Sequence, residues 1–139
     1  MIQYPRILFL LLLFATAPVL AQNPSYGPKP FVINYLKSDY NADNQNWSVT
    51  AVDNGMVYFG NHSGLLSFDG SNWETTKVPE QPVIRSVAVR DEKRIYVGAY
   101  EEFGYFQKDA KGLKTYYSLS DSLDQDVFHN DEIWRICDP

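Results

Sequence analysis

The stretch SVTAVDNGMVYFG at residues 48–60 recurs 38 positions later as SVAVRDEKRIYVG at residues 86–98. Five of the thirteen positions are identical, namely Ser48 and Ser86, Val49 and Val87, Asp53 and Asp91, Tyr58 and Tyr96, and Gly60 and Gly98. A third copy begins at residues 133–136, where IWRI echoes IRSV at residues 84–87. Self-similarity with a period of about 40 residues, built from short strands, is typical of propeller blades.

Each copy contains four short apolar or alternating segments separated by turn residues, which is the pattern of a four-stranded antiparallel sheet. Asn54-Gly55 favours a tight hairpin turn, because both residues tolerate a positive φ. The sequence therefore predicts an all-β fold, a partial β-propeller of about two four-stranded blades plus the start of a third. The strands are expected at residues 48–52, 57–60, 65–68, 73–76, 85–89, 95–98, 103–107 and 115–119.

The amino-terminal segment MIQYPR carries one arginine and precedes the apolar run ILFLLLLFATAPVL. That layout is typical of a secretory signal peptide, and the run is shorter than the roughly 18 to 20 residues that span a bilayer. We expect cleavage between Ala21 and Gln22, and hence an exported protein. Removing 21 of the 139 residues leaves 118. These make fewer blades than the roughly four to eight of a closed propeller, so the chain is expected to be an amino-terminal fragment.

The expected organisation has three parts. A signal peptide occupies residues 1–21, an extended arm residues 22–46, and an incomplete propeller residues 47–139, with blades at about 47–78 and 83–119 and a third starting at 132–139. The arm either supplies the outer strand of the last blade or is a leader without fixed structure. The only helix expected is a turn within residues 120–126, capped by Ser120.

Composition and charge exclude several functions. The net charge is −5 and basic residues do not cluster, so nucleic acid is not expected as a partner of this segment. His62 and His129 lack metal-ligand spacing, and the single Cys137 is expected to be a buried apolar residue whose partner strand is missing. Adjacent strand residues such as Glu101 and Glu102 point to opposite faces, which suits acid/base catalysis poorly. We therefore expect no catalytic residue, metal or cofactor.

The candidate ligand-binding residues lie in the loops between the second and third strands of each copy. In a propeller these loops share one rim with the connections between blades, here residues 79–82. The candidates are Asn61, His62, Tyr100 and Glu101. Tyr100 either stacks its ring on a sugar or another planar group or packs between blades. The tryptophans Trp47, Trp73 and Trp134 are expected to be core or blade-joining residues.

Several short strings along residues 31–136 together resemble the periplasmic sensor proteins of Bacteroidetes, which are built from two-component regulator propeller repeats. The strings are INY at 33–35, YNA at 40–42, QNWS at 45–48, VYFGN at 57–61, GLL at 64–66, FDG at 68–70, VIRSV at 83–87, IYVG at 95–98 and EFGY at 102–105, with Trp73. Members of this family often carry a triple-tyrosine domain after the propellers.

The resemblance implies a periplasmic ligand-sensing module of a transmembrane regulator. The remainder of the propeller, a membrane anchor and a signalling output, either a histidine kinase or a LuxR-type DNA-binding domain, would follow this segment. Such a full-length protein can dimerise, and its ligand would be an unidentified small molecule or glycan. The expected location is the periplasm, with the whole protein anchored in the cytoplasmic membrane.

Two other functions fit the same repeats. The chain could form the first blades of a secreted propeller enzyme that acts on polysaccharide, which requires carboxylates, tyrosine and histidine to converge on the channel. It could also be a small secreted scaffold that completes a propeller by self-association, although a half-finished third unit would leave strand edges unpaired.

Overall fold

The computed structural model describes residues 27, 30–80, 83–91, 93–124 and 130–137. It divides into two units, residues 1–34 and residues 35–139, and every helix and strand of the described residues belongs to the second. The expected signal peptide and His129 lie outside the described residues. Within the described part of the chain, no helix is long and apolar enough to cross a membrane.

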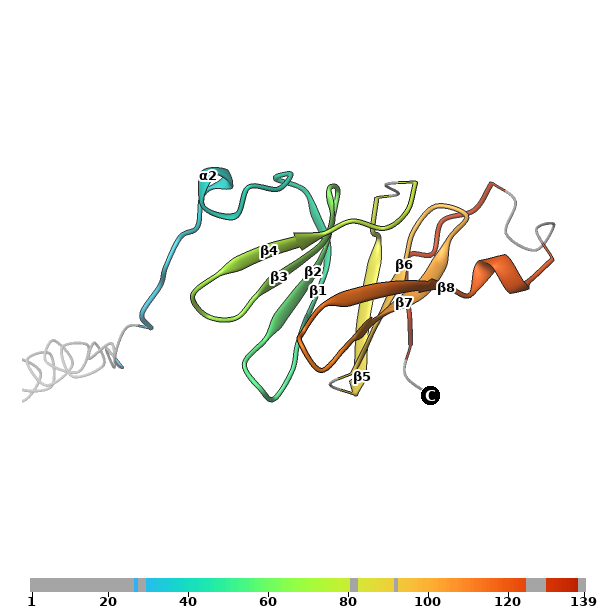
Figure 1. The fold of residues 1–139 in the computed structure, drawn as a ribbon. Coiled ribbons are helices and arrows are strands. Elements are labelled where there is room, and N and C mark those ends of the chain that lie inside the picture. The colour runs from blue at the N-terminus through green and yellow to red at the C-terminus, as the bar shows by residue number, and fades with distance from the viewer. Residues whose placement is uncertain (1–26, 28–29, 81–82, 92, 125–129, 138–139) are drawn as a thin grey trace, which may run out of the picture. The chain divides into compact units, whose positions relative to one another are not determined.

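Eight strands form two four-stranded antiparallel sheets, and within each sheet every strand pairs with the next along the chain (Figure 1). All eight expected strands are present, with ends that differ by at most two residues, and the prediction of an all-β, propeller-like fold is confirmed. The first sheet contains β1 (Asn46–Ala51), β2 (Val57–Asn61), β3 (Gly64–Phe68) and β4 (Trp73–Thr76). The second contains β5 (Ser86–Asp91), β6 (Arg94–Gly98), β7 (Phe103–Lys108) and β8 (Lys114–Ser118).

The sequence repeat is also a repeat of strand register. Ser48 pairs with Gly60 in the first sheet as Ser86 pairs with Gly98 in the second. A Cβ atom on either glycine would lie 2.5 Å from the hydroxyl oxygen of its paired serine. The serine therefore requires a partner without a side chain, which explains why both residues recur together.

The core lies between the two sheets, where β1 and β2 contact β5 (Figure 1). Alternate side chains of a strand point to opposite faces, and one apolar face of each sheet is buried here. This arrangement matches neighbouring blades. The buried cluster comprises Tyr58, Leu65, Val78, Ile84, Val87, Ile95, Val97 and Phe106.

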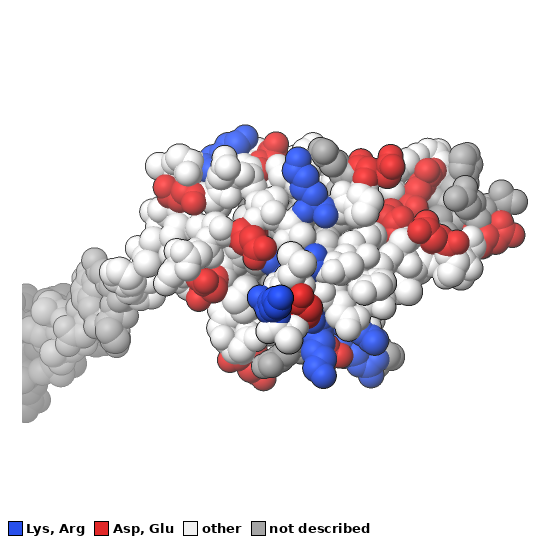
Figure 2. Space-filling view, in the orientation of Figure 1, with Lys and Arg blue, Asp and Glu red and all other residues white. Residues whose placement is uncertain are grey.

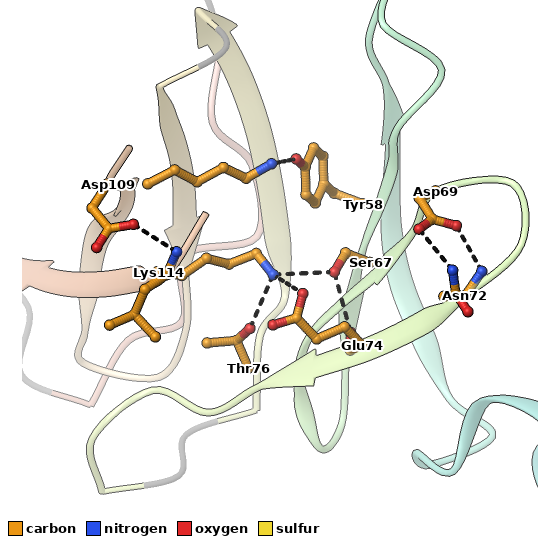
Figure 3. A network of polar contacts seen from close by, with 10 residues as sticks. Tyr58, Ser67, Asp69, Asn72, Glu74, Thr76, Asp109 and Lys114 are labelled. Atoms are coloured by element: carbon orange, nitrogen blue, oxygen red, sulfur yellow. Dashed lines mark hydrogen bonds and ion pairs between the residues drawn. The ribbon is translucent and has the colours of Figure 1, made fainter. Parts of the chain in front are cut away.

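Two lysines of the second sheet reach polar groups of the first. The side chain of Lys114 is only 3% exposed, and its Nζ donates to the Glu74 carboxylate and to the hydroxyls of Ser67 and Thr76 (Figure 3). Lys108 Nζ donates to the Tyr58 hydroxyl at 2.6 Å. These contacts join residues about 40 to 50 positions apart, so they add polar specificity to the apolar packing between the sheets.

Aspartates shape the tight turns between strands. The Asp69 carboxylate accepts hydrogen bonds from the backbone N–H and the side chain of Asn72 (Figure 3). It also accepts the backbone N–H of Ser71. Bonds to the charged form hold the pKa of Asp69 below its ordinary value, with the Asn72 backbone contributing most. Asp91 plays the same part before β6.

The arm contains a short helix, α2 (Lys37–Tyr40), which the sequence did not predict. Its N-terminus is fixed by Asp39, whose carboxylate accepts the Leu36 N–H at 2.7 Å. Asn41 ends the helix in the left-handed region with φ of 46°. Tyr35 and Tyr40 then pack on Trp73, so the second half of the expected arm lies on the first sheet and forms no strand before β1.

The other expected helical turn is shorter than predicted. It is η2 (Ser120–Ser122), a single 3-10 turn, and residues 125–126 of the expected segment lie outside the described residues. The hydroxyl of Ser118, rather than that of the expected cap Ser120, accepts the N–H of Asp121 at 3.2 Å. The cap position itself is Leu119, which makes no side-chain cap hydrogen bond.

Residues 132–137 form no strand. Ile133 nevertheless contacts the second sheet in the way that Ile84 contacts the first. The N–H of Ile84 donates to Asn61, and that of Ile133 donates to Ala99, the residue 38 positions after Asn61. Glu132 forms an isolated bridge with Tyr100. Cys137, expected to be buried, is exposed because none of the described residues covers it.

Trp47 and Trp134 join successive repeats, whereas Trp73 packs on aromatic rings of the arm and the first sheet. Arg85 lies between Trp47 and Trp134, with its guanidinium carbon 4.0 Å from one ring centroid and 4.9 Å from the other. The two indole rings meet edge to face with centroids 5.7 Å apart. Arg85 also pairs with Glu132 at 2.7 Å. Trp47, Arg85 and Trp134 occupy one repeat position in three successive copies, so this contact ties the three copies together.

Candidate ligand-binding cleft

A cleft of about 510 Å³ lies beside the β6–β7 turn. Its wall is formed by this turn, the connection between the two sheets, β8 and η2. The cleft therefore lies on one rim of the two sheets. A volume of this size falls in the range of small-molecule sites. The lining residues are Pro79, Glu80, Tyr100, Glu101, Glu102, Tyr116, Ser118 and Asp121.

Two of the four sequence candidates, Tyr100 and Glu101, are in this cleft. Pro79 and Glu80 confirm that the connection between blades shares the rim with the turn; residues 81–82 lie outside the described residues. Glu102 belongs to the predicted rim loop but was not chosen as a ligand-binding candidate, and neither were Tyr116, Ser118 and Asp121. The alternation of Tyr116 and Ser118 along β8 is the signal that could have found two of them, since it puts both on one face.

Tyr100 presents its ring to the cleft rather than to the core. Its side chain is 45% exposed, and its hydroxyl donates to Asn130 Oδ1 at 2.9 Å. Partial burial raises the pKa of the phenol, and the nearby carboxylate charge of Glu101 adds to this. The residue therefore offers an aromatic face and a protonated hydroxyl at neutral pH.

Glu101 occupies a strained backbone position. Its φ is 51°, a conformation in which glycine or asparagine is ordinarily favoured. Its carboxylate accepts the Asn130 N–H at 2.5 Å. Glu80, on the opposite wall, also has a positive φ, of 65°. Two glutamates thus stand in the cleft where the fold alone favours glycine or asparagine, a pattern that is common at functional sites.

Glu102 is fixed by hydrogen bonds from β8. The hydroxyl of Tyr116 donates to its Oε1 at 2.6 Å and that of Ser118 at 2.9 Å. Burial and the bond to Glu102 raise the pKa of Tyr116, so this phenol remains a donor. Both Glu101 and Glu102 line the cleft, although Glu101 belongs to the turn and β7 begins only at Phe103. Their carboxylates have different partners, Asn130 for Glu101 and β8 for Glu102.

The cleft is acidic. Four of its lining residues are carboxylates, namely Glu80, Glu101, Glu102 and Asp121, and none is Lys or Arg. On the face drawn in Figure 2, Asp and Glu side chains gather near the β6–β7 turn and η2. The carboxylates would repel an anionic group placed among them, so the cleft disfavours anionic ligands. Across the described residues, no group of three or more His, Cys, Asp or Glu side chains is arranged to hold a metal ion.

The other two candidates lie in the equivalent turn of the first sheet. Asn61 is completely buried. Both the NH₂ group and the carbonyl oxygen of its side-chain amide form hydrogen bonds with neighbouring groups. Nδ2 donates to the Asp43 carbonyl and to Asn46 Oδ1, while Oδ1 accepts the N–H groups of Asp43 and Ser63. His62 is exposed at the tip of the turn. Neither residue lines the cleft.

Replacing Asn61 tests whether its amide anchors the arm. Asn61→Ala removes a completely buried amide and the hydrogen bonds that it makes to Asp43 and Ser63, and we expect a loss of about 1–3 kcal/mol in the free energy of unfolding, measured by urea denaturation. Asn46→Ala is the matched control, because Asn46 is exposed and shares only one of these bonds. Equal stabilities of the two variants would contradict an anchoring role.

The described residues thus form two blades of a propeller-like all-β protein with an acidic, tyrosine-bearing cleft on one rim. Comparison of the chain with protein-family models, with curated proteins and with solved structures finds no match.

Proposed function

We propose that this chain is the ligand-binding, amino-terminal part of an exported sensor, whose propeller binds a small molecule or glycan and signals through a membrane-anchored region. The observation that carries the proposal is the cleft beside Tyr100, in which two glutamates are held at positive φ. A positive φ ordinarily favours glycine or asparagine rather than glutamate, and we attribute the two glutamates to a role in recognition.

The chemistry of the cleft favours an uncharged, hydroxyl-rich ligand. The half-exposed ring of Tyr100 offers a stacking surface for a sugar ring, and carboxylates accept hydrogen bonds from hydroxyl groups. Anionic saccharides such as uronates would meet four carboxylates. The proposed ligand is therefore a neutral saccharide or a similar polyol.

Binding is favoured over turnover. A polysaccharide-cleaving enzyme with a tyrosine base would need a phenol that loses its proton readily, whereas the pKa values of Tyr100 and Tyr116 are both raised. Both hydroxyls are suited to donate hydrogen bonds instead. This argues against a tyrosine base in the cleft, which is one requirement of the secreted-enzyme alternative.

The sensor assignment is tested by the size and cell fraction of the native polypeptide, detected with an antibody against residues 47–107. We expect a membrane-bound species several times longer than the 139 residues of this chain. A soluble exported species of about this length would overturn the assignment and favour the self-associating scaffold.

The cleft is tested by calorimetric titration of the exported protein with cellohexaose and with hexagalacturonate. We expect the neutral sugar to bind more tightly, and Tyr100→Ala to weaken its binding about tenfold, which corresponds to about 1.4 kcal/mol. Tyr100→Phe keeps the ring and should keep the affinity. Glu101→Asn suits the positive φ and isolates the loss of charge. Tighter binding of the uronate, or equal affinity of Tyr100→Ala and the parent, would contradict the proposed site.

A further inference from the structure

The outer part of one face of the second sheet is not covered by the described residues and carries a row of tyrosines. Tyr96, Tyr105 and Tyr117 are paired across β6, β7 and β8. The rings of Tyr105 and Tyr117 stack with centroids 5.3 Å apart and 18° between their planes. The guanidinium of Arg94 lies 5.1 Å from the Tyr105 ring centroid. Tyr117 remains 46% exposed. We call Arg94, Tyr96, Tyr105 and Tyr117 the tyrosine face.

The equivalent face of the first sheet is the one on which the second sheet packs. Tyr58, Ser67 and Glu74 are paired across β2, β3 and β4. Tyr96 and Tyr105 stand 38 positions after Tyr58 and Ser67, and Tyr117 takes the register position of Glu74. In the first sheet these positions receive Lys108 and Lys114 of the neighbouring sheet, and Tyr58 is only 2% exposed. The tyrosine face is therefore the repeat equivalent of an established interface.

The chain already enters this face in the way that it enters the first interface. A Cβ on Gly60 would lie 3.1 Å from Ile84 Cγ2, and one on Gly98 would lie 2.6 Å from Ile133 Cγ2. Ser86 Oγ donates to the Ile133 carbonyl at 2.7 Å. Residues 133–134 thus cover the inner part of the face, as residues 84–85 do one repeat earlier, while the tyrosine face beside them is open.

We propose that the tyrosine face docks a third four-stranded sheet, whose innermost strand begins with residues 133–136 and which presents a carboxylate to Arg94 and apolar groups to the Tyr105–Tyr117 stack. Its chemistry differs from that of the first interface. At the first interface, the second sheet brings lysines to a carboxylate and a hydroxyl of the first sheet. At the tyrosine face, the second sheet itself supplies the cation, Arg94, so the third sheet would supply the acceptor.

The rings of this face are not arranged as a platform for a planar ligand. Tyr105 and Tyr117 stack on each other, so their edges and hydroxyls face outward. This geometry suits packing against side chains of another sheet. The inference concerns packing between sheets and does not depend on what the cleft beside Tyr100 binds, so either can fail without the other.

Photo-crosslinking of the native protein in its own cell tests this docking. A benzoylphenylalanine replaces Tyr117 in one variant and Leu113 in a control. Leu113 is 68% exposed but lies in the β7–β8 turn, away from the face. We expect position 117, and not position 113, to crosslink within the same chain to a peptide carboxy-terminal to Trp134.

The role of the Arg94 charge is tested by the same crosslinking measurement. With the probe at position 117, Arg94→Glu should lower the crosslink yield severalfold, while Arg94→Lys should preserve it. A crosslink between two copies would assign the face to a second chain and overturn the inference. The absence of any protein crosslink at position 117, or a yield that Arg94→Glu leaves unchanged, would also overturn it.

Discussion

Lys114→Glu is expected to separate the two sheets. The lysine side chain is 3% exposed and its ammonium group bonds to Glu74, Ser67 and Thr76 (Figure 3). A glutamate there would place a second carboxylate beside Glu74, at a position where the native side chain is 3% exposed and an unpaired charge is strongly unfavourable. We expect a loss of about 3 kcal/mol or more in the free energy of unfolding, seen as a lower urea midpoint.

Three further variants identify the cause of that loss. Lys114→Met keeps most of the buried volume and leaves Glu74 in contact with solvent, because Glu74 is 65% exposed, so it should cost no more than about 1–2 kcal/mol. Lys111→Glu makes the same charge change at an exposed site in the β7–β8 turn and should have little effect. Glu74→Lys should partly rescue Lys114→Glu. If Lys111→Glu and Lys114→Glu proved equally stable, the buried contact would not hold the sheets together.

The strands and their register could be predicted from the sequence because local rules determine them. Alternating apolar residues, Asn54-Gly55 and the aspartate turns each act within a few positions. The buried contact of Lys114 could not be predicted in this way. A lysine in a polar segment ordinarily faces solvent, and its partner Glu74 lies 40 positions earlier, so only the packing of one sheet on the other reveals its burial.

The candidate site was partly predictable for the same reason. Tyr100 and Glu101 follow from the position of the turn between the second and third strands of the second copy. Asn61 stands at the start of the corresponding turn in the first copy, yet residues 43–46 return over this turn and bury it. The arm has no repeat partner in the sequence, so its path could not be inferred. Glu102, Tyr116 and Ser118 meet only through the pairing of β7 with β8.

The second large loss of stability is expected on substitution of Gly104 in β7, because both the strand pairing and the cleft require a residue without a side chain at this position. A Cβ at this position would lie 2.3 Å from the Tyr117 carbonyl oxygen and 2.6 Å from the Tyr116 hydroxyl. The carbonyl belongs to β8, so it cannot move away without disturbing the pairing of β7 with β8. Gly104→Ala should therefore lower the free energy of unfolding by roughly 1–3 kcal/mol.

The same substitution should also disturb the cleft, which separates it from an ordinary loss of stability. The Tyr116 hydroxyl that the new methyl group would displace is the one that holds Glu102 at 2.6 Å. Gly104→Ala should thus weaken cellohexaose binding even in conditions where the variant is fully folded, as judged by tryptophan fluorescence. Gly27→Ala is the matched control, because a Cβ there meets no atom within 4 Å. Unchanged stability of Gly104→Ala would refute the close approach of the two strands, whereas lost stability with undiminished binding would show that Tyr116 does not position Glu102 for the ligand.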